Sequence, residues 1–299
     1  MSDLTIADRT IDGPHGPIPV RLYAPESARA GFVWLHGGGF AAGDLDMPEA
    51  DWVCRTLAAA GIAVVSVDYR LAPVPEGWDR RADEATLVRK HHPAASDEGV
   101  VAFTWATSAA DAGETVPWSA HLRWALGGAS AGGNVATATA LRLVHGAGPV
   151  PDLLVLAYPT LHAVQPPHSA ELTALLEANP EHAGFTPEVI AGMYANFIGG
   201  AVADADLYAV PGTATADDLA GFPPTLMVND ELDALRTSGE DFARRLADAG
   251  IPIDVSVESG ESHGHLNRAE AAAEATLARF AAGILALADT PSSLSSQEA

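Results

Sequence analysis

The chain alternates short apolar runs with longer segments of helical character. Leu4 to Ile11 and Ile18 to Tyr23 alternate apolar and polar residues across a glycine- and proline-containing turn, which predicts a β-hairpin. The later runs are continuously apolar, as is typical of strands buried on both faces of a parallel sheet. These predicted strands are Phe32 to Leu35, Ile62 to Val67, Leu122 to Leu126, Leu153 to Ala157, Thr225 to Val228 and Ile253 to Val257.

Helical segments separate these strands. They are Pro48 to Ala60, Glu98 to Ala112, Val135 to His145, Pro187 to Ile198, Gly239 to Ala249 and Ala269 to Ala288. Strands that alternate with helices predict an α/β fold with a mostly parallel sheet covered on both faces. No repeat or long linker divides residues 1–299, so a single domain is expected, with a polar and disordered tail at 290–299.

Composition narrows the classes of function. With 299 residues, 48% of them apolar, the chain is long enough to bury a large core. A net charge of −23 argues against nucleic acid and anionic membrane surfaces as partners. The single cysteine, Cys54, excludes an internal disulfide and a cysteine-rich metal site. Met1 to Thr10 hold no apolar run, so neither a signal peptide nor a membrane span is expected there, and a cytoplasmic location is predicted.

A glycine-rich turn follows the predicted strand Leu122 to Leu126. Residues 128–132 fit G-x-S-x-G, the sharp strand-to-helix turn that holds a nucleophilic serine in a strained and exposed position. Small residues are needed around it because the backbone approaches the strand and the helix start closely. Ser130 is therefore the candidate nucleophile, and the alternative is an ordinary glycine turn with a chance serine.

A second glycine run, His36 to Gly39, follows the predicted strand Phe32 to Leu35. Sites in parallel sheets form at the carboxyl ends of the strands, so this run is expected beside Ser130. HGGG runs of this kind lend backbone N–H groups to an oxyanion hole, where a side chain would block the substrate carbonyl. The amide of Ala131 is expected to add a donor, and a flexible glycine turn is the alternative reading.

A serine nucleophile needs a histidine to accept its proton and a carboxylate to orient that histidine. In this fold the order along the chain is serine, acid, histidine. That order leaves His263 and His265 among the eleven histidines. His263 is preferred because the last predicted strand ends nearby and Gly264 leaves room beside it.

Spacing alone leaves the acid open. The loop after the strand Thr225 to Val228 offers Asp230, Glu231 and Asp233. Each of them on its own would be an ordinary solvated surface carboxylate. A resemblance to a known family chooses among the three.

The chain resembles the hormone-sensitive-lipase-like (bacterial family IV) carboxylesterases, from about Gly31 to the last helix. Five motifs occur in the order of that family: His36-Gly37-Gly38-Gly39-Phe40, Asp68-Tyr69-Arg70-Leu71-Ala72-Pro73, Gly128-Ala129-Ser130-Ala131-Gly132-Gly133-Asn134, Asp233-Ala234-Leu235-Arg236 and His263-Gly264-His265. Together they are hard to reach by chance. The resemblance implies an α/β-hydrolase fold with a small helical cap, and an enzyme that needs no metal or cofactor.

The resemblance also assigns residues. The acid of the family's D-P-L-R maps onto Asp233, with alanine in place of proline after it, and the histidine of H-G-F maps onto His263. The family's oxyanion donors map onto Gly38, Gly39 and Ala131. His36 and the Asp68-Tyr69-Arg70 group are then expected to fix the oxyanion loop.

The implied function is serine carboxylesterase activity on short-chain acyl esters through an acyl-enzyme. The same triad serves amide, carbamate or lactone hydrolysis and acyl transfer, so these reactions stay open. A non-catalytic ligand-binding protein on this fold is disfavoured because Ser130, Asp233 and His263 are all present. A small-molecule ester is the expected partner, and a homo-oligomer is compatible with the sequence.

The segment Val74 to His91 has no counterpart in the family pattern. It follows the strand Ile62 to Val67, so it leaves the sheet at the edge that carries Ser130. A short helix is predicted from Asp79 to Lys90. We expect 74–92 and 160–200 to form a cap, and we expect substrate contacts from three side chains, Phe40, Trp78 and Leu87. A surface helix packed away from the site is the alternative.

Overall fold

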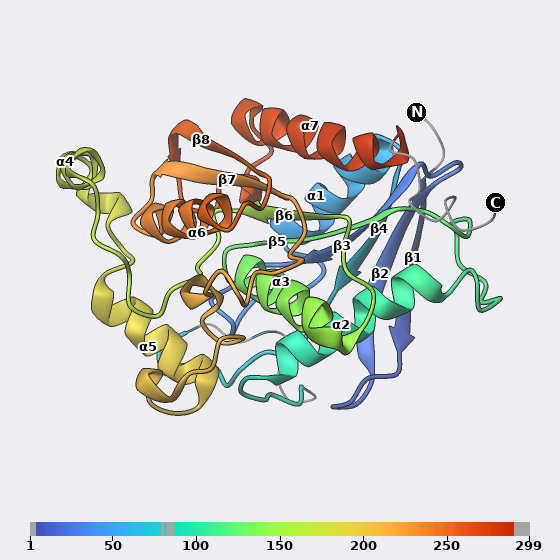
Figure 1. The fold of residues 1–299 in the computed structure, drawn as a ribbon, viewed down its shortest axis with the longest axis horizontal. Helices are drawn as coiled ribbons and strands as arrows, with labels where there is room; N and C mark the ends of the chain where they lie inside the picture. The colour runs from blue at the N-terminus through green and yellow to red at the C-terminus, as the bar shows by residue number, and fades with distance from the viewer. Residues whose placement is uncertain (1–3, 79–80, 82–86, 290–299) are drawn as a thin grey trace.

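The computed structural model describes residues 4–78, 81 and 87–289 (Figure 1). The tail 290–299, where disorder is expected, lies outside the described residues. So does most of the helix predicted from Asp79 to Lys90, and the described residues 87–90 of that segment are not helical.

An eight-stranded sheet forms the centre of the molecule. Its spatial order is β1-β2-β4-β3-β5-β6-β7-β8; β2 pairs antiparallel with β1 and β4, and the other neighbours pair in parallel. The strands are β1 (Leu4–Ile11), β2 (Ile18–Pro25), β3 (Ala30–Leu35), β4 (Ile62–Val67), β5 (Trp124–Ala129), β6 (Leu153–Ala157), β7 (Thr225–Leu232) and β8 (Ile253–Ser262). The predicted hairpin and the predicted mostly parallel sheet are confirmed.

Helices cover both faces of this sheet (Figure 1). The helices are α1 (Pro48–Ala59), α2 (Ala94–Ser108), α3 (Ala131–Arg142), α4 (Ala170–Ala178), α5 (Pro187–Ile198), α6 (Arg236–Asp248) and α7 (Ala271–Ala286). On one face α1 and α7 pack on side chains such as Phe32 and Trp34. On the other face α2, α3 and α6 pack on side chains such as Val33 and Leu35. The continuous apolar runs reflect this burial on both faces.

The stretch Ala271–Asp289, which is α7 together with the 3-10 turn after it, is long and apolar enough, by length and composition, to cross a membrane, and it is the one such helix in the described part of the chain. In the structure it lies on the sheet, and Leu277, Phe280 and Ile284 on its inner face are buried there. Its apolar character therefore has a partner within the fold.

The segment between β6 and β7 carries α4 and α5, which lie at one end of the sheet (Figure 1). Two aromatic residues anchor α5. The hydroxyl of Tyr194 donates to the carbonyl of Thr160 at 2.9 Å and accepts from the amide of Asn134 at 3.0 Å. The ring of Phe197 stacks on Phe40, with ring centroids 4.0 Å apart. These contacts fix α5 beside the turn that carries Ser130.

Candidate active site

The turn between β5 and α3 holds Ser130 in a strained backbone conformation, with φ of 52° and ψ of −118°. Its neighbours must be glycine for steric reasons. A Cβ on Gly128 would lie 2.3 Å from the carbonyl oxygen of Gly132, and a Cβ on Gly132 would lie 2.1 Å from that of Leu35. The turn fits only because these side chains are absent.

His263 and Asp233 complete a hydrogen-bonded chain that starts at Ser130. Asp233 follows the end of β7, and His263 follows the end of β8. The Ser130 hydroxyl donates to His263 Nε2 at 2.8 Å, and His263 Nδ1–H donates to Asp233 Oδ2 at 2.7 Å. Asp233 is fully buried, and its other oxygen accepts from the amide of Leu235 at 2.9 Å. This is the arrangement that activates a serine nucleophile.

The charges around His263 set its protonation. Burial disfavours the imidazolium and lowers its pKa, but the carboxylate of Asp233 acts in the opposite direction and prevails. The negative charge of Glu49 acts in the same direction as Asp233. The pKa of His263 is therefore raised above its usual value of 6.5.

The glycine run after β3 is held by a buried carboxylate. Glu49, on α1, is 2% exposed, and its Oε1 accepts from the amide of Gly37 at 2.6 Å. Its Oε2 accepts from the hydroxyl of Tyr158 at 2.7 Å and from the side-chain amide of Asn267 at 3.1 Å. One carboxylate thus connects the loop after β3, the end of β6 and the turn that follows His263.

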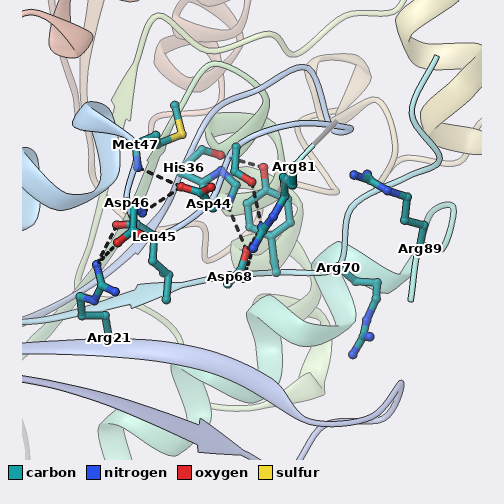
Figure 2. A network of polar contacts seen from close by, with 12 residues as sticks. Arg21, His36, Asp44, Leu45, Asp46, Met47, Asp68, Arg70, Arg81 and Arg89 are labelled. Atoms are coloured by element: carbon teal, nitrogen blue, oxygen red, sulfur yellow. Dashed lines mark hydrogen bonds and ion pairs between the residues drawn. The ribbon is translucent and has the colours of Figure 1, made fainter. Parts of the chain in front are cut away.

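A second network supports the loop from the side of β4 (Figure 2). The guanidinium of Arg81 binds both oxygens of Asp68, at 2.7 and 3.1 Å, and donates to the carbonyl of Gly43 at 3.0 Å. The backbone carbonyl of His36 accepts from the hydroxyl of Tyr69 at 2.7 Å. Burial raises the pKa of Asp68, but the His36 ring, with Nε2 3.8 Å from Oδ1, and the Arg81 guanidinium outweigh it and hold the pKa below its ordinary value. Asp68 therefore joins the inserted segment to the glycine loop.

Ser130 opens into a cavity of about 310 Å³. Glycines and the candidate residues Ser130 and His263 form its floor, and apolar side chains from α5, from the loop before α5 and from the inserted segment form its wall. The lining residues are Gly38, Gly39, Ala42, Met47, Glu49, Trp78, Ser130, Phe185, Val189, Met193, His263, Gly264 and Asn267. Phe185 packs edge-on against the His263 ring, with centroids 4.7 Å apart. Segments far apart in the sequence therefore enclose the site.

The three side chains predicted to contact substrate lie in different places in the structure. Trp78 lines the Ser130 cavity, where its indole lies so close to Gly39 that a Cβ there would be 2.7 Å from the ring. Phe40 is 1% exposed and packs into the core on Phe197, so it does not line this cavity. Leu87 lines a different cavity of about 260 Å³ beside Asp68. Of the three, Trp78 alone remains a candidate contact.

The structure also shows where the other candidate base, His265, and the other candidate acids, Asp230 and Glu231, lie. His265 is 1% exposed and faces Asp230, which is fully buried. The Glu231 carboxylate accepts from the hydroxyl of Ser259 and the amide of Gly260 at the surface. None of the three side chains is hydrogen-bonded to Ser130. In the described part of the chain, no group of three histidine, cysteine or acidic side chains is placed to hold a metal ion.

Glu49 was missed by the sequence analysis although a signal was present. Its position is four residues before Val53 and eight before Leu57, so it shares the buried face of α1 with them. A carboxylate on an apolar helix face needs hydrogen-bond donors when it is buried. The wall residues Met47 and Phe185 carried no such signal, because they lie in loops.

Comparisons with known proteins add independent information. Residues 32–267 match the family model described as the alpha/beta hydrolase fold. The chain is 34% identical over 288 residues to esterase LipI of Mycobacterium tuberculosis, covering 92% of this chain and 80% of LipI. The solved structure titled brefeldin A esterase, a bacterial homologue of human hormone-sensitive lipase, has a TM-score of 0.79 at 27% identity and covers 97% of this chain and 78% of that one. The chain belongs to the hormone-sensitive-lipase-like carboxylesterases.

This family membership confirms the resemblance predicted from the five motifs, and with it the enzyme class of carboxylic ester hydrolase. Another relative of this hormone-sensitive-lipase-like carboxylesterase is an ethyl acetate hydrolase of Pseudomonas putida, 32% identical over 273 residues and covering 88% of this chain and 74% of the relative. A solved esterase from Pyrobaculum calidifontis has a TM-score of 0.78 at 29% identity, covering 97% of this chain and 87% of that one. The α/β-hydrolase fold predicted from the sequence is confirmed.

Proposed function

We propose that this protein is a serine carboxylesterase that hydrolyses short-chain acyl esters with Ser130, His263 and Asp233 as its triad. The hydrogen-bonded chain of 2.8 and 2.7 Å from Ser130 through His263 to Asp233, at the floor of an open cavity, carries the proposal. The esterase relatives supply the class of bond that is broken.

The reaction follows from this geometry. Ser130 Oγ attacks the ester carbonyl carbon while His263 Nε2 takes the hydroxyl proton. Asp233 holds Nδ1–H and stabilises the imidazolium that forms. The tetrahedral intermediate then collapses, His263 gives its proton to the departing alcohol, and the acyl group stays on Ser130. A water molecule, deprotonated by His263, attacks the acyl-enzyme and releases the carboxylic acid.

The oxyanion is stabilised by the amides of Gly38, Gly39 and Ala131 in this proposal. Gly38 and Gly39 line the cavity with Ser130, and Ala131 begins α3. The amide of Gly37 donates to Glu49, so it is committed elsewhere. That commitment favours the register Gly38 and Gly39 within the three glycines. Donors fixed before the reaction stabilise the developing charge without reorganising.

The wall of the cavity supports a preference for small uncharged esters. Trp78, Val189 and Met193 give it an apolar surface, and a volume of about 310 Å³ suits a small acyl or alcohol group. We include 160–200, with α4 and α5, as the cap of a single α/β-hydrolase domain over 1–299. In the inserted segment, Trp78 acts as part of that cap.

The proposal is tested with purified protein and paired substrates of matched shape. Phenyl esters of acetic, butyric and octanoic acid are compared with acetanilide as the amide, and product analysis in the presence of methanol reports acyl transfer. Faster hydrolysis of the acetate and butyrate than of the octanoate, with slow acetanilide cleavage, supports the proposal. Amide cleavage or transfer that exceeds ester hydrolysis overturns it.

The pH dependence is expected to follow His263. Catalysis needs neutral Nε2, and the pKa of His263 is raised, so kcat/KM should increase with pH through a midpoint above 6.5. The midpoint lies above 6.5 because the negative charge of Asp233 stabilises the imidazolium, which is the inactive form of His263. Initial rates with phenyl acetate between pH 5 and 9 measure the midpoint, and a midpoint well below 6.5 would contradict it.

Trp78→Ala is expected to change substrate preference more than stability. The indole is 42% exposed, so its removal empties part of the wall without opening the core. The ratio of kcat/KM for octanoate over acetate should rise by about tenfold, as expected for a few methylene groups gaining an apolar site. The melting temperature should change little. Val88→Ala, at an exposed side chain outside this cavity, is the matched control; an unaltered acyl profile in Trp78→Ala would mean that another element limits the pocket.

A further inference from the structure

A second buried acid–base pair lies beside the proposed triad. Asp230 Oδ1 and His265 Nδ1 are 2.5 Å apart, and the two residues are 0% and 1% exposed. Asp230 and Asp233 both stand at the carboxyl end of β7, and His263 and His265 belong to one turn after β8. The same strand end therefore holds the same turn at two points.

His265 departs from the family pattern. In H-G-F the residue two positions after the histidine is phenylalanine, and this chain has histidine there. A polar ring that is buried needs hydrogen-bonding or charged partners. Both of its nitrogens have a polar atom within 3.0 Å, Asp230 on one side and the hydroxyl of Thr276 on the other.

The hydrogen-bond directions fix the number of protons in this pair. The Thr276 hydroxyl has a single proton, and it donates that proton to Glu258 Oε1 at 2.9 Å. It must therefore accept from His265 Nε2–H, at 3.0 Å. A neutral imidazole would then present the lone pair of Nδ1 to a carboxylate oxygen only 2.5 Å away, which is repulsive. The pair must therefore hold a second proton, on the ring or on the carboxyl group, so Asp230 and His265 together carry no net charge, although Nδ1 and Oδ1 are in ion-pair contact without hydrogen-bond geometry.

The groups around this pair come from every element that packs on it. The charges of Asp233 and His263 act on Asp230. Helix α7 supplies Thr276, and strand β8 supplies Glu258. The ring of Tyr158 stands edge-on to both histidines, with centroids 5.1 Å from His263 and 5.3 Å from His265. The hydroxyl of Tyr158 donates to Glu49. An uncompensated charge on Asp230 would act on His263, because that carboxylate favours the imidazolium.

We propose that Asp230 and His265 are positioning residues: together they fix the turn that carries His263, and the second proton that the pair holds cancels the negative charge beside it. His263 reaches Ser130 and Asp233 from a turn of only a few residues, so a shift of that turn changes both hydrogen bonds. His265 acts as the second anchor of the turn, and it takes no part in proton transfer to substrate.

Two substitutions at Asp230 separate anchoring from charge. Asp230→Asn keeps a side chain that can bond to His265 and replaces a neutral pair by a neutral pair. Its kcat should stay within about threefold of wild type, since the turn keeps its anchor. Asp230→Ala removes the anchor, and kcat should fall by about 10- to 100-fold with little change in KM. His265→Phe breaks the pair from the other side with the residue of the family pattern.

The readout of charge is the titration of the His263 ring, followed by NMR, with assignment by comparison with His263→Gln. This measurement does not depend on ester hydrolysis, whereas the kcat comparison rests on the proposed function. If the wild-type protein does not hydrolyse esters, the proposed function is wrong, and the titration still tests the Asp230–His265 pair. The midpoint should be the same in wild type and Asp230→Asn. A fall of about one unit or more in Asp230→Asn would reveal an uncompensated carboxylate and overturn the neutral pair.

The matched control is Asp241→Ala. Asp241 Oδ2 lies 3.2 Å from Nε2 of His162, another buried histidine, and neither residue contacts the triad. If Asp241→Ala keeps its kcat while Asp230→Ala loses it, the loss comes from the His263 turn. Full kcat in Asp230→Ala or His265→Phe overturns the anchor. If those two variants do not fold, Asp230→Asn decides: a wild-type kcat and titration support the proposal, and a loss of either overturns it.

Discussion

Ser130→Ala is expected to lower kcat/KM for a short acyl ester by roughly 10⁴-fold or more, as in other serine triads. In the proposed mechanism the hydroxyl oxygen forms the acyl-enzyme, and the proposed oxyanion donors alone cannot replace it. Folding should be unaffected, because alanine is smaller and the turn is set by Gly128 and Gly132. Rates with phenyl acetate, the melting temperature and the mass of a phosphonate adduct measure these outcomes.

The chain offers a matched control for that variant. Ser238 Oγ is 2.9 Å from Nδ1 of His162, which in turn lies near Asp241, so serine, histidine and aspartate occur together a second time. Ser238 is fully buried and accepts from the amide of Leu161, so no substrate reaches it. Ser238→Ala should keep its activity. A stoichiometric phosphonate adduct on any residue other than Ser130 would refute the assignment of the nucleophile.

Asp233→Asn is expected to lower kcat/KM by about 10⁴-fold, in line with the same change in other triads. Asp233 Oδ2 accepts Nδ1–H of His263, and an amide that donates in its place forces the proton onto Nε2. The ring then cannot accept the proton of Ser130. The volume hardly changes, so the loss should be in kcat and not in stability. Steady-state rates across pH 6–9, with circular dichroism as the check on folding, measure it.

Two neighbouring carboxylates serve as controls for Asp233→Asn. Asp230→Asn should keep most of its activity, for the reasons given above. Glu231→Gln should keep it as well, because that side chain bonds to Ser259 and Gly260 at the surface. If either control loses as much as Asp233→Asn, the acid has been misassigned.

Hydrophobic patterning predicted the order of strands and helices, and it failed at their ends where glycine is involved. The strand expected to end at Leu126 continues through Gly127 and Gly128 to Ala129. Glycine normally weakens a strand, but here the neighbours come too close for any side chain, and a Cβ on Gly127 would lie 2.4 Å from the carbonyl of Val155. Only the packed structure reveals that approach.

The start of α2 also differs from the prediction, and a charged residue lies there. The helix was expected to begin at Glu98 and begins at Ala94. The carboxylate of Glu98 is buried, and it binds the backbone amide and the guanidinium of Arg70. A side chain recruited by a distant segment carries no local signature.

The residues of the site likewise divide into those that the sequence predicts and those that it does not. Ser130, Asp233 and His263 lie in motifs, because a strained turn and strand ends leave a pattern in the sequence. The cavity wall does not, since Met47 and Phe185 reach it from loops whose positions depend on remote contacts. The hydrogen bonds of Tyr194 to Thr160 and Asn134, for example, determine where α5 lies. Among Phe40, Trp78 and Leu87, the sequence could not tell which side chain reaches the cavity.

The three bonds of Glu49 have a consequence for engineering this enzyme. Gly37, Tyr158 and Asn267 all bind one carboxylate, so the glycine loop after β3 and the turn that carries His263 cannot be redesigned separately. In the cavity wall, by contrast, Trp78 and Val189 come from separate segments and are exposed. A mutant library aimed at new substrates should therefore vary the wall residues singly and leave the floor intact. Changes to the floor will have to be made as a set.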